Sequence, residues 1–422
     1  MRALTASSSP EDPIAQTTTR RFAGLVSALD QAWLSALSLA VSLAFIYFAT
    51  KEQYGDYLLL LTPLFLIQGI QNALILSPVS TVLPSAPPAE QDLTYGTAVA
   101  SLVAFAVIAG VGGGIGLAIY SWLAHGSASP LLVGAFGLAV AGVCAREGRR
   151  TLHFAGGDST RALRSDLTYG LGLLLCCAGL CYFAALTPAA ALLSTGMAAL
   201  WTYAFALGRI RLLRIHGQVI RRFWACGRWA LVGAVVTWIN LSVYPLVVGI
   251  TLGSAAVADL NVARLFLMPV GLAIAAWSNV FRPRLSSWMA NGNPAEVQRV
   301  CVRAISFGLA LHLGFLALLA LVYPYAQLML EPSYRGLLPL VLLWGGYFAF
   351  NMVRSILMAT LMTDAQGYKI IQASSWVALL VSTSGLALLS HQGAPWVVVV
   401  LIAVELTQVA MIGSAAMRRW KK

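Results

Sequence analysis

The chain alternates long apolar runs with short polar connections, and this alternation repeats about twelve times. Most runs hold about twenty predominantly apolar residues, which is the length an α-helix needs to cross the hydrocarbon core of a bilayer. The pattern therefore predicts about twelve membrane-spanning helices. We expect them at Leu25–Phe48, Leu58–Val79, Thr97–Leu123, Leu131–Ala145, Leu167–Leu186, Ala189–Leu207, Ala230–Ile250, Val257–Val280, Ile305–Val322, Leu337–Ala359, Ile371–Leu389 and Val397–Met417.

The composition supports this interpretation. Hydrophobic residues make up 59% of the 422 residues and charged residues only 10%, whereas about 25% of the residues of a soluble domain are charged. The sequence therefore predicts an all-α polytopic membrane protein. The net charge of +12 does not indicate a nucleic-acid partner, because the cations lie in short connections between apolar runs.

The distribution of lysine and arginine predicts how the spans are oriented. If the N-terminus lies inside, the inward segments hold 23 of the 27 lysines and arginines, and the outward loops hold only Lys51 and Arg335. Cytoplasmic loops of membrane proteins are enriched in these residues. We therefore expect an even number of spans and two cytoplasmic termini.

A basic segment divides the chain into halves. Residues 209–228 contain six arginines, and at helical periodicity a basic face lies opposite an apolar face that includes Phe223 and Trp224. This pattern is typical of a helix on the membrane surface that contacts anionic lipids; a solvated linker is the alternative. The expected organisation is a disordered cytoplasmic tail (1–22), a six-helix bundle (23–208), this linker (209–228) and a second six-helix bundle (229–422).

The sequence gives little indication of catalysis. The cluster Gly112–Gly116 lies inside an apolar run and lacks the Lys-Ser/Thr pair of a phosphate-binding loop. The six cysteines form no paired CxxC array, so we expect neither a metal nor another cofactor. The predicted protein is not an enzyme.

Several motifs of the first half carry a resemblance to a known family. They lie at Ala28–Ala32, Lys51–Tyr57, Arg146–Arg150, His153–Gly157 and Arg161–Leu167. In these motifs the chain resembles the bacterial polysaccharide-export proteins, which include the O-antigen and lipid-linked oligosaccharide flippases. Their superfamily also contains multidrug-and-toxin extruders and peptidoglycan-precursor flippases.

The resemblance implies a fold and a function. It implies two six-helix bundles around a central V-shaped cavity in the bacterial inner membrane. It also implies alternating access that moves an undecaprenyl-type lipid-linked glycan outward, for polysaccharide or O-antigen synthesis. Other membrane proteins of polysaccharide assembly are candidate partners. The resemblance supplies no set of catalytic residues.

Polar side chains within the expected spans are the candidate substrate contacts, because such residues are costly in a bilayer. An aqueous cavity lined by amides and hydroxyls suits sugars, whereas hydrogen bonding between helices is the alternative explanation. For Asp30, pairing with an arginine of a loop is an equal alternative. The uncharged candidates are Gln31, Gln68, Asn72, Asn240, Tyr347 and Asn351.

Arg264 and Arg354 lie furthest from the loops among the cations. A guanidinium group suits a lipid pyrophosphate because it can donate two parallel hydrogen bonds. Two alternatives remain open: Arg264 pairs with Asp259, or Arg354 extends its head towards the membrane surface.

His312 and Glu405 fall near the centres of their spans and are candidates for ion coupling. The alternative for His312 is a neutral ring bonded to a neighbour. For Glu405 it is a hydrogen bond to Gln408, one turn away.

Three functions are compatible with this sequence. The favoured one is a flippase for a lipid-linked oligosaccharide. A multidrug or cation antiporter would need acidic cavity residues, yet the spans hold as many arginines as buried acids. A membrane glycan polymerase or ligase would need catalytic groups outside, and the expected outward loops are short and nearly uncharged.

Overall fold

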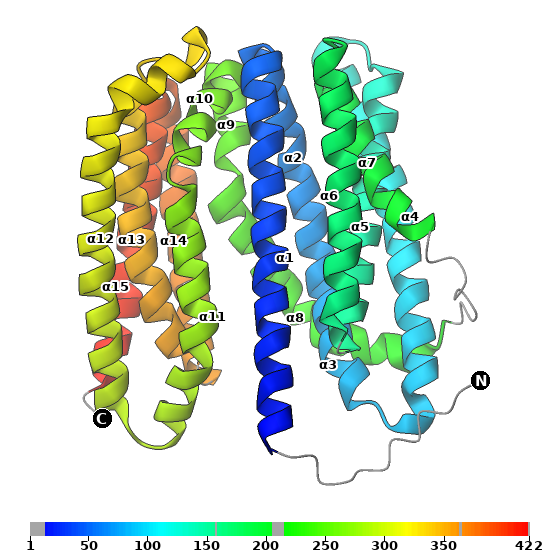
Figure 1. The fold of residues 1–422 in the computed structure, drawn as a ribbon, viewed down its shortest axis with the longest axis vertical. Coiled ribbons are helices and arrows are strands. Elements are labelled where there is room, and N and C mark those ends of the chain that lie inside the picture. The colour runs from blue at the N-terminus through cyan, green and yellow to red at the C-terminus, as the bar shows by residue number, and fades with distance from the viewer. Residues whose placement is uncertain (1–12, 157, 205–214, 363–364, 421–422) are drawn as a thin grey trace. The chain divides into compact units, whose positions relative to one another are not determined.

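The computed structural model describes residues 13–156, 158–204, 215–362 and 365–420, in which every regular element is a helix (Figure 1). The first half contains α1 (Pro13–Phe48), α2 (Lys51–Gln71), the π-helix η1 (Asn72–Leu76), α3 (Ser77–Ser85), α4 (Pro88–His125), α5 (Pro130–Ala155), α6 (Ser159–Tyr182) and α7 (Pro188–Ala204). The second half contains α8 (Gly217–Ser242), α9 (Tyr244–Leu252), α10 (Ser254–Leu265), α11 (Met268–Ala290), α12 (Pro294–Met329), the 3₁₀-helix η3 (Pro332–Tyr334), α13 (Leu338–Leu361), α14 (Ala365–Leu389), the 3₁₀-helix η4 (Ser390–Gln392) and α15 (Ala394–Trp420).

The prediction of an all-α polytopic membrane protein is confirmed. Among the described residues, ten helices are long and apolar enough to cross a membrane, and α10 with α11 forms an eleventh candidate bent by 58°. Helix α7 covers the described part of the sixth predicted span. The orientation of the termini stays a prediction.

Two predicted spans are interrupted where proline and glycine make a continuous helix costly. Helix α9 follows α8 after one residue and has Pro245 in its first turn, where the missing N–H costs nothing. Gly253, at φ +87°, separates α9 from α10, a backbone conformation that suits glycine. Pro269 lies in the first turn of α11, next to the bend.

Three expectations of the sequence need correction. Helix α1 begins at Pro13, so the last ten residues of the predicted tail are helical. Helix α5 continues to Ala155 and carries three arginines that we expected in a loop, because buried acids pair with two of them. Helix α8 runs without a break from Gly217 to Ser242, so the described end of the linker belongs to the helix that enters the candidate span Ala230–Leu252. The linker's place on the membrane surface stays a prediction. Residues 205–214 lie outside the described residues.

The chain forms two compact units, and their boundaries differ from the predicted division at the linker. Unit 1 comprises Met1–Val41, Ile75–Leu180 and Leu192–Phe223, as far as these are described. Unit 2 comprises Ser42–Leu74, Cys181–Ala191 and Trp224–Lys422. Helix α2, from the first half of the sequence, therefore belongs to unit 2. The six-plus-six organisation stays a prediction.

In unit 1, small residues let neighbouring helices approach closely. A Cβ atom on Gly110 of α4 would collide with the Gly137 carbonyl of α5, and a Cβ on Gly142 would collide with the Gly196 carbonyl of α7. Close backbone approach of this kind replaces the hydrophobic driving force that is missing between helices in lipid. Gly110 and Gly142 therefore serve packing.

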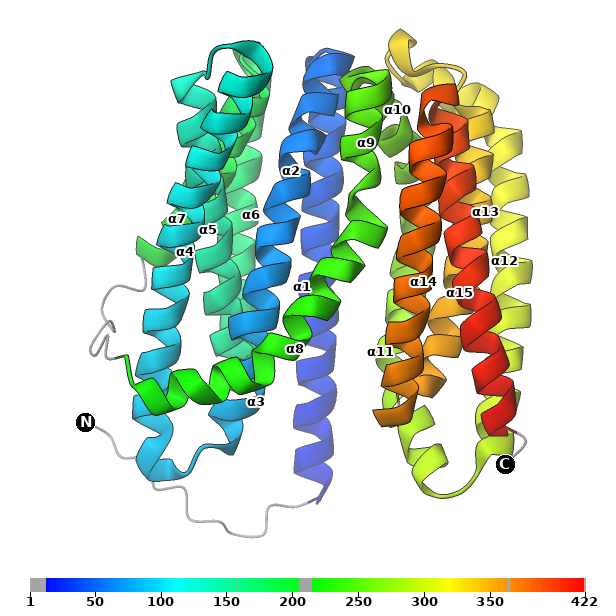
Figure 2. The ribbon, with the colours of Figure 1, turned by 180° about the vertical axis from the view of Figure 1, so that it is seen from behind.

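In unit 2, α13 packs against α11, α12 and α15, and α14 packs along α15. Helices α12 to α15 lie side by side in both views (Figures 1 and 2). Trp344 of α13 is 1% exposed at the centre of the core, where Tyr244 and Tyr347 contact its ring. Helix α2 lies against α10, and no side chain fits at Gly55 because it would overlap the Ser254 carbonyl.

Candidate functional sites in the two units

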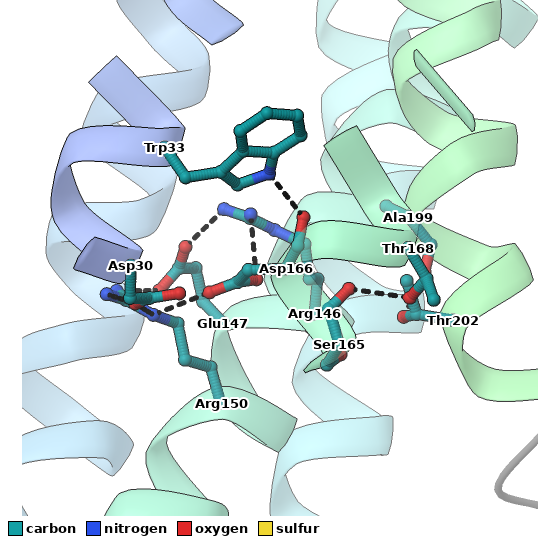
Figure 3. Close-up of polar contacts among 10 residues, drawn as sticks. All are labelled: Asp30, Trp33, Arg146, Glu147, Arg150, Ser165, Asp166, Thr168, Ala199 and Thr202. Atoms are coloured by element: carbon teal, nitrogen blue, oxygen red, sulfur yellow. Dashed lines mark hydrogen bonds and ion pairs between the residues drawn. The ribbon is translucent and has the colours of Figure 1, made fainter. Parts of the chain in front are cut away.

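Unit 1 contains a buried charge cluster formed by Asp30 of α1, Arg146, Glu147 and Arg150 of α5, and Asp166 of α6 (Figure 3). Arg150 donates to Asp30 at 2.6 Å, and its Nε lies 2.9 Å from a carboxylate oxygen of Asp166. Arg146 donates to Asp166 at 3.2 Å and to Glu147 at 2.5 Å. We call these five residues the α1–α5–α6 cluster.

The α1–α5–α6 cluster is closed by its surroundings. Asp30 and Asp166 are fully buried. The guanidinium of Arg146 lies 4.3 Å from the ring centre of Tyr169, and Trp33 donates from its indole nitrogen to the Asp166 carbonyl at 2.9 Å. Arg146 contacts two carboxylates and Arg150 contacts three, so these ion pairs join three helices. Asp30 is therefore paired with an arginine, which was the alternative to substrate contact. Gln31, next to it in the sequence, is exposed.

Unit 2 contains a polar cavity of about 110 Å³ between α8, α13, α14 and α15. Its lining combines one cation, one acid, two amides and several hydroxyl groups with apolar side chains. The polar lining residues are Thr237, Asn240, Tyr347, Arg354, Ser374, Ser375, Glu405 and Gln408. The structure therefore brings four of the predicted site residues, Asn240, Tyr347, Arg354 and Glu405, to one cavity.

Arg354 and Glu405 form an ion pair at the wall of this cavity. Arg354 donates from Nε to Glu405 at 2.6 Å, and Asn351 donates to the other carboxylate oxygen at 3.0 Å. The Glu405 side chain is 2% exposed and that of Arg354 15%. Arg354 also contacts the sulfur of Met358. Among the described residues, its second terminal amino group has no acceptor, so the pair leaves donor capacity unused.

The remaining polar groups of the cavity are only partly satisfied. Asn240 donates to the Ser375 carbonyl at 3.0 Å, whereas its own side-chain oxygen is buried without a hydrogen-bond partner in the described part of the chain. A buried acceptor without a donor is costly, and a ligand N–H or O–H would satisfy it. Gln408 lines the same cavity, but Asn351 and Arg354 hold the oxygens of Glu405.

Arg264 lines a second, smaller cavity of about 70 Å³ in unit 2, together with Thr62 and Asn261. It donates to the Asn261 side chain at 3.1 Å. Asp259 pairs with Lys51 instead, at 2.7 Å. The alternative of an Arg264–Asp259 pair is therefore wrong, since Asp259 has a cation from another helix. The guanidinium of Arg354 bonds to Glu405, whereas the alternative for this residue was a head extended towards the membrane surface.

The other sequence candidates lie apart from both cavities. His312 is 3% exposed, and one ring nitrogen lies 2.9 Å from the Gly345 carbonyl oxygen, so the ring is bonded to a neighbour. Gln68 is half-buried, and Asn72 is exposed at the start of the π-helix η1.

A junction of several segments surrounds Lys51 in unit 2. Besides pairing with Asp259, Lys51 donates to the Ser333 carbonyl at 3.2 Å and lies over the Tyr334 ring. Burial raises the pKa of Tyr334, so its ring stays neutral. The two loops that we expected outside, those of Lys51 and Arg335, therefore lie close together in space.

Sequence reasoning missed Glu147, Asp166, Ser374 and Ser375. The helical spacing of Arg146, Arg149 and Arg150 was an available signal that α5 continues past its apolar part. The acids that compensate these arginines lie up to 120 residues away in the sequence. Span hydropathy carries no information about such partners.

No protein-family model and no curated protein sequence matches the chain. Solved structures match nearly all of it at low sequence identity. The structure described as lipid II flippase MurJ in an inward closed conformation aligns with a TM-score of 0.70 at 11% identity, covering 94% of this chain and 89% of that one. An inward-facing multidrug resistance MATE family transporter gives 0.68 at 11%, covering 92% and 94%.

A third structure, a MOP superfamily transporter from Pyrococcus furiosus, aligns with a TM-score of 0.63 at 10% identity and covers 96% of both chains. All three similarities extend over more than nine-tenths of this chain. The TM-scores show a common fold, whereas identities of 10–11% leave the substrate of this chain open. The chain therefore has the fold of the MOP superfamily transporters.

Proposed function

We propose that the chain is a transporter, and specifically a flippase that moves a lipid-linked oligosaccharide across the bacterial inner membrane. The observation that carries this proposal is the polar cavity of unit 2. It presents Arg354 beside the amides of Asn240 and Gln408 and the hydroxyls of Ser374 and Ser375.

This combination matches the chemistry of a glycosyl pyrophosphate. The guanidinium supplies charge-assisted hydrogen bonds to phosphate oxygens, and the buried oxygen of Asn240 needs a donor such as a sugar hydroxyl. The fold supports a carrier of amphipathic substrates, since the matched structures include one described as a lipid II flippase. The lipid tail would stay in the bilayer, and alternating access would carry the headgroup.

The competing proposal is a drug or cation antiporter, because the matched structures also include multidrug transporters. A cationic substrate needs an uncompensated acid. In the polar cavity the single acid, Glu405, is already paired with Arg354. The pair occupies the single cation as well, but the second terminal amino group of Arg354 has no acceptor among the described residues. This unused donor favours an anionic substrate over a cationic one.

Complementation tests the proposal. The chain is expressed in a strain that lacks its own O-antigen flippase, and glycan reaching the cell surface is measured together with the abundance of the protein in the membrane. We expect export to be restored by the wild-type chain and lost with Arg354→Ala. Efflux of a cationic dye without restored export would favour the antiporter instead.

A further inference from the structure

Glu405 occupies a position that an anionic ligand of Arg354 would need. Its carboxylate accepts from Arg354 Nε at 2.6 Å and from Asn351 at 3.0 Å, and both partners sit on α13 while Glu405 comes from α15. A carboxylate and a phosphate use the same planar donor edge of a guanidinium. The two anions therefore compete for one cation at the wall of one cavity.

We propose that Glu405 is a displaceable counter-ion: a phosphate group of the transported lipid takes its place at Arg354, and Glu405 then takes up a proton. This inference rests on the proposed function, because it requires an anionic substrate in the polar cavity. It assigns to Glu405 the role of coupling substrate binding to proton uptake. No covalent bond forms or breaks, and one proton passes from solvent to the carboxylate.

The surroundings of Glu405 explain why the displaced acid takes up a proton. Arg354 is the only cation in the described lining of the cavity, and Tyr347 is the other titratable group from α13. The amides of Asn240 and Gln408 and the hydroxyls of Ser374 and Ser375 complete its polar lining on α8, α14 and α15, with Thr237 of α8. Neither α9, α12 nor η4 contributes to that lining, and His312 of α12 is bonded to Gly345.

The Glu405 side chain is 2% exposed, so its charged form is strongly disfavoured once it loses its cation. Protonation removes the charge and leaves an O–H donor, which the oxygens of nearby amides and hydroxyls can accept. Because the bound state then holds one more proton than the free state, a lower pH favours binding. The same linkage makes neutralisation of Glu405 by mutation equivalent to adding that proton.

Binding of a polyprenyl pyrophosphate to the purified full chain tests this coupling. Wild-type protein and Glu405→Gln are placed in lipid nanodiscs, and geranylgeranyl pyrophosphate is titrated in by calorimetry at pH 7.5. Repeating the titration in two buffers of different ionisation enthalpy gives the number of protons taken up. The titration of the pyrophosphate itself contributes equally to both proteins and cancels in the difference.

We expect wild-type protein to take up about one proton more than Glu405→Gln. We also expect Glu405→Gln to bind about tenfold more tightly, which is the low end of the coupling measured for close charge pairs. Asn351→Ala provides a second variant, because it removes the other donor that holds Glu405. It should also tighten binding, whereas a purely structural role of Asn351 predicts weaker binding.

The contrary results separate this inference from the proposed function. Equal affinity and equal proton uptake in wild type and Glu405→Gln, with binding lost in Arg354→Ala, would overturn the coupling and leave the anion site in place. Weaker binding by both Glu405→Gln and Asn351→Ala would also overturn it. Equal binding by Arg354→Ala and wild type, or no binding by any of the proteins, would overturn the proposed function as well.

Discussion

Two arginine–carboxylate groups inside the same chain have different surroundings. In unit 1, the residues of the α1–α5–α6 cluster line neither of the two cavities described above, and Asp30 and Asp166 are fully buried. In unit 2, the Arg354–Glu405 pair is also buried, but it borders a cavity of about 110 Å³. The α1–α5–α6 cluster lines neither of the two cavities, whereas the Arg354–Glu405 pair has an unused donor at the wall of one cavity and can exchange partners. We therefore interpret the first group as structural and propose the second as the substrate-binding group.

The largest expected effect tests the structural half of this comparison. Asp166→Ala removes a fully buried acid that contacts both Arg146 and Arg150. Arg146 keeps Glu147 and Arg150 keeps Asp30, but each loses a buried acceptor. A buried donor left without its acceptor costs about 1–3 kcal/mol, and more when the donor is charged. We expect the amount of folded protein in membranes to fall sharply, as measured by size-exclusion chromatography of a fluorescent fusion. Normal abundance of this variant would contradict a structural role for the α1–α5–α6 cluster.

The next effect tests the functional half. Arg354→Ala should lower export roughly 30-fold, because truncating one partner of a buried charge pair costs about 2 kcal/mol or more. Arg354→Lys keeps the charge but loses the planar donor edge, so its export should lie between that of the wild-type protein and that of Arg354→Ala. The double variant Arg354→Ala, Glu405→Gln controls for the acid left unpaired. Restored export in that double variant would show that Arg354 only neutralises Glu405.

A smaller effect sharpens the boundary of the site. Asn240→Ala removes the unpartnered acceptor and the donor to Ser375. A single hydrogen bond contributes about 1 kcal/mol, so export should fall roughly fivefold at normal abundance. Gln68→Ala is the matched control, because Gln68 is half-buried and lines neither cavity. Equal losses in the two variants would place Asn240 outside the binding site.

The smallest effect belongs to an ion pair that is open to its surroundings. Lys51 and Asp259 each keep 22% of their side-chain exposure, and exposed pairs contribute about 0–1 kcal/mol. Lys51→Met should lower the unfolding temperature of the detergent-solubilised protein by only a few degrees and leave export near the wild-type level. A loss of export as large as that of Arg354→Ala would assign the junction around Lys51 a role in transport.

The span pattern could be predicted from the sequence because each span depends on its own residues. The segment Val397–Met417 lies entirely within α15, and Ile305–Val322 lies within α12. The ends of the helices were harder to predict. Helix α5 continues through three arginines because Asp30 and Asp166, on other helices, compensate two of them.

The candidate site was predicted in its residue types and only partly in its pairings. Arg354 and Glu405 stand out in the sequence because charges are rare in apolar runs, yet 51 residues separate them and nothing local indicates that they meet. Asp259 shows the same limit: its nearby candidate was Arg264, whereas its partner is Lys51, more than 200 residues earlier. Packing between distant segments decides these pairs.

Reconstituted lipid flipping tests the central claim most directly. Vesicles that contain the purified chain and a fluorescent polyprenyl-pyrophosphate-linked oligosaccharide are treated with an impermeant quencher, and the rate at which the protected fluorescence disappears is measured. The proposed function predicts that wild-type protein accelerates this exchange over protein-free vesicles and that Arg354→Ala does not. Exchange at the protein-free rate with wild-type protein, together with uptake of a cationic dye by the same vesicles, would contradict it.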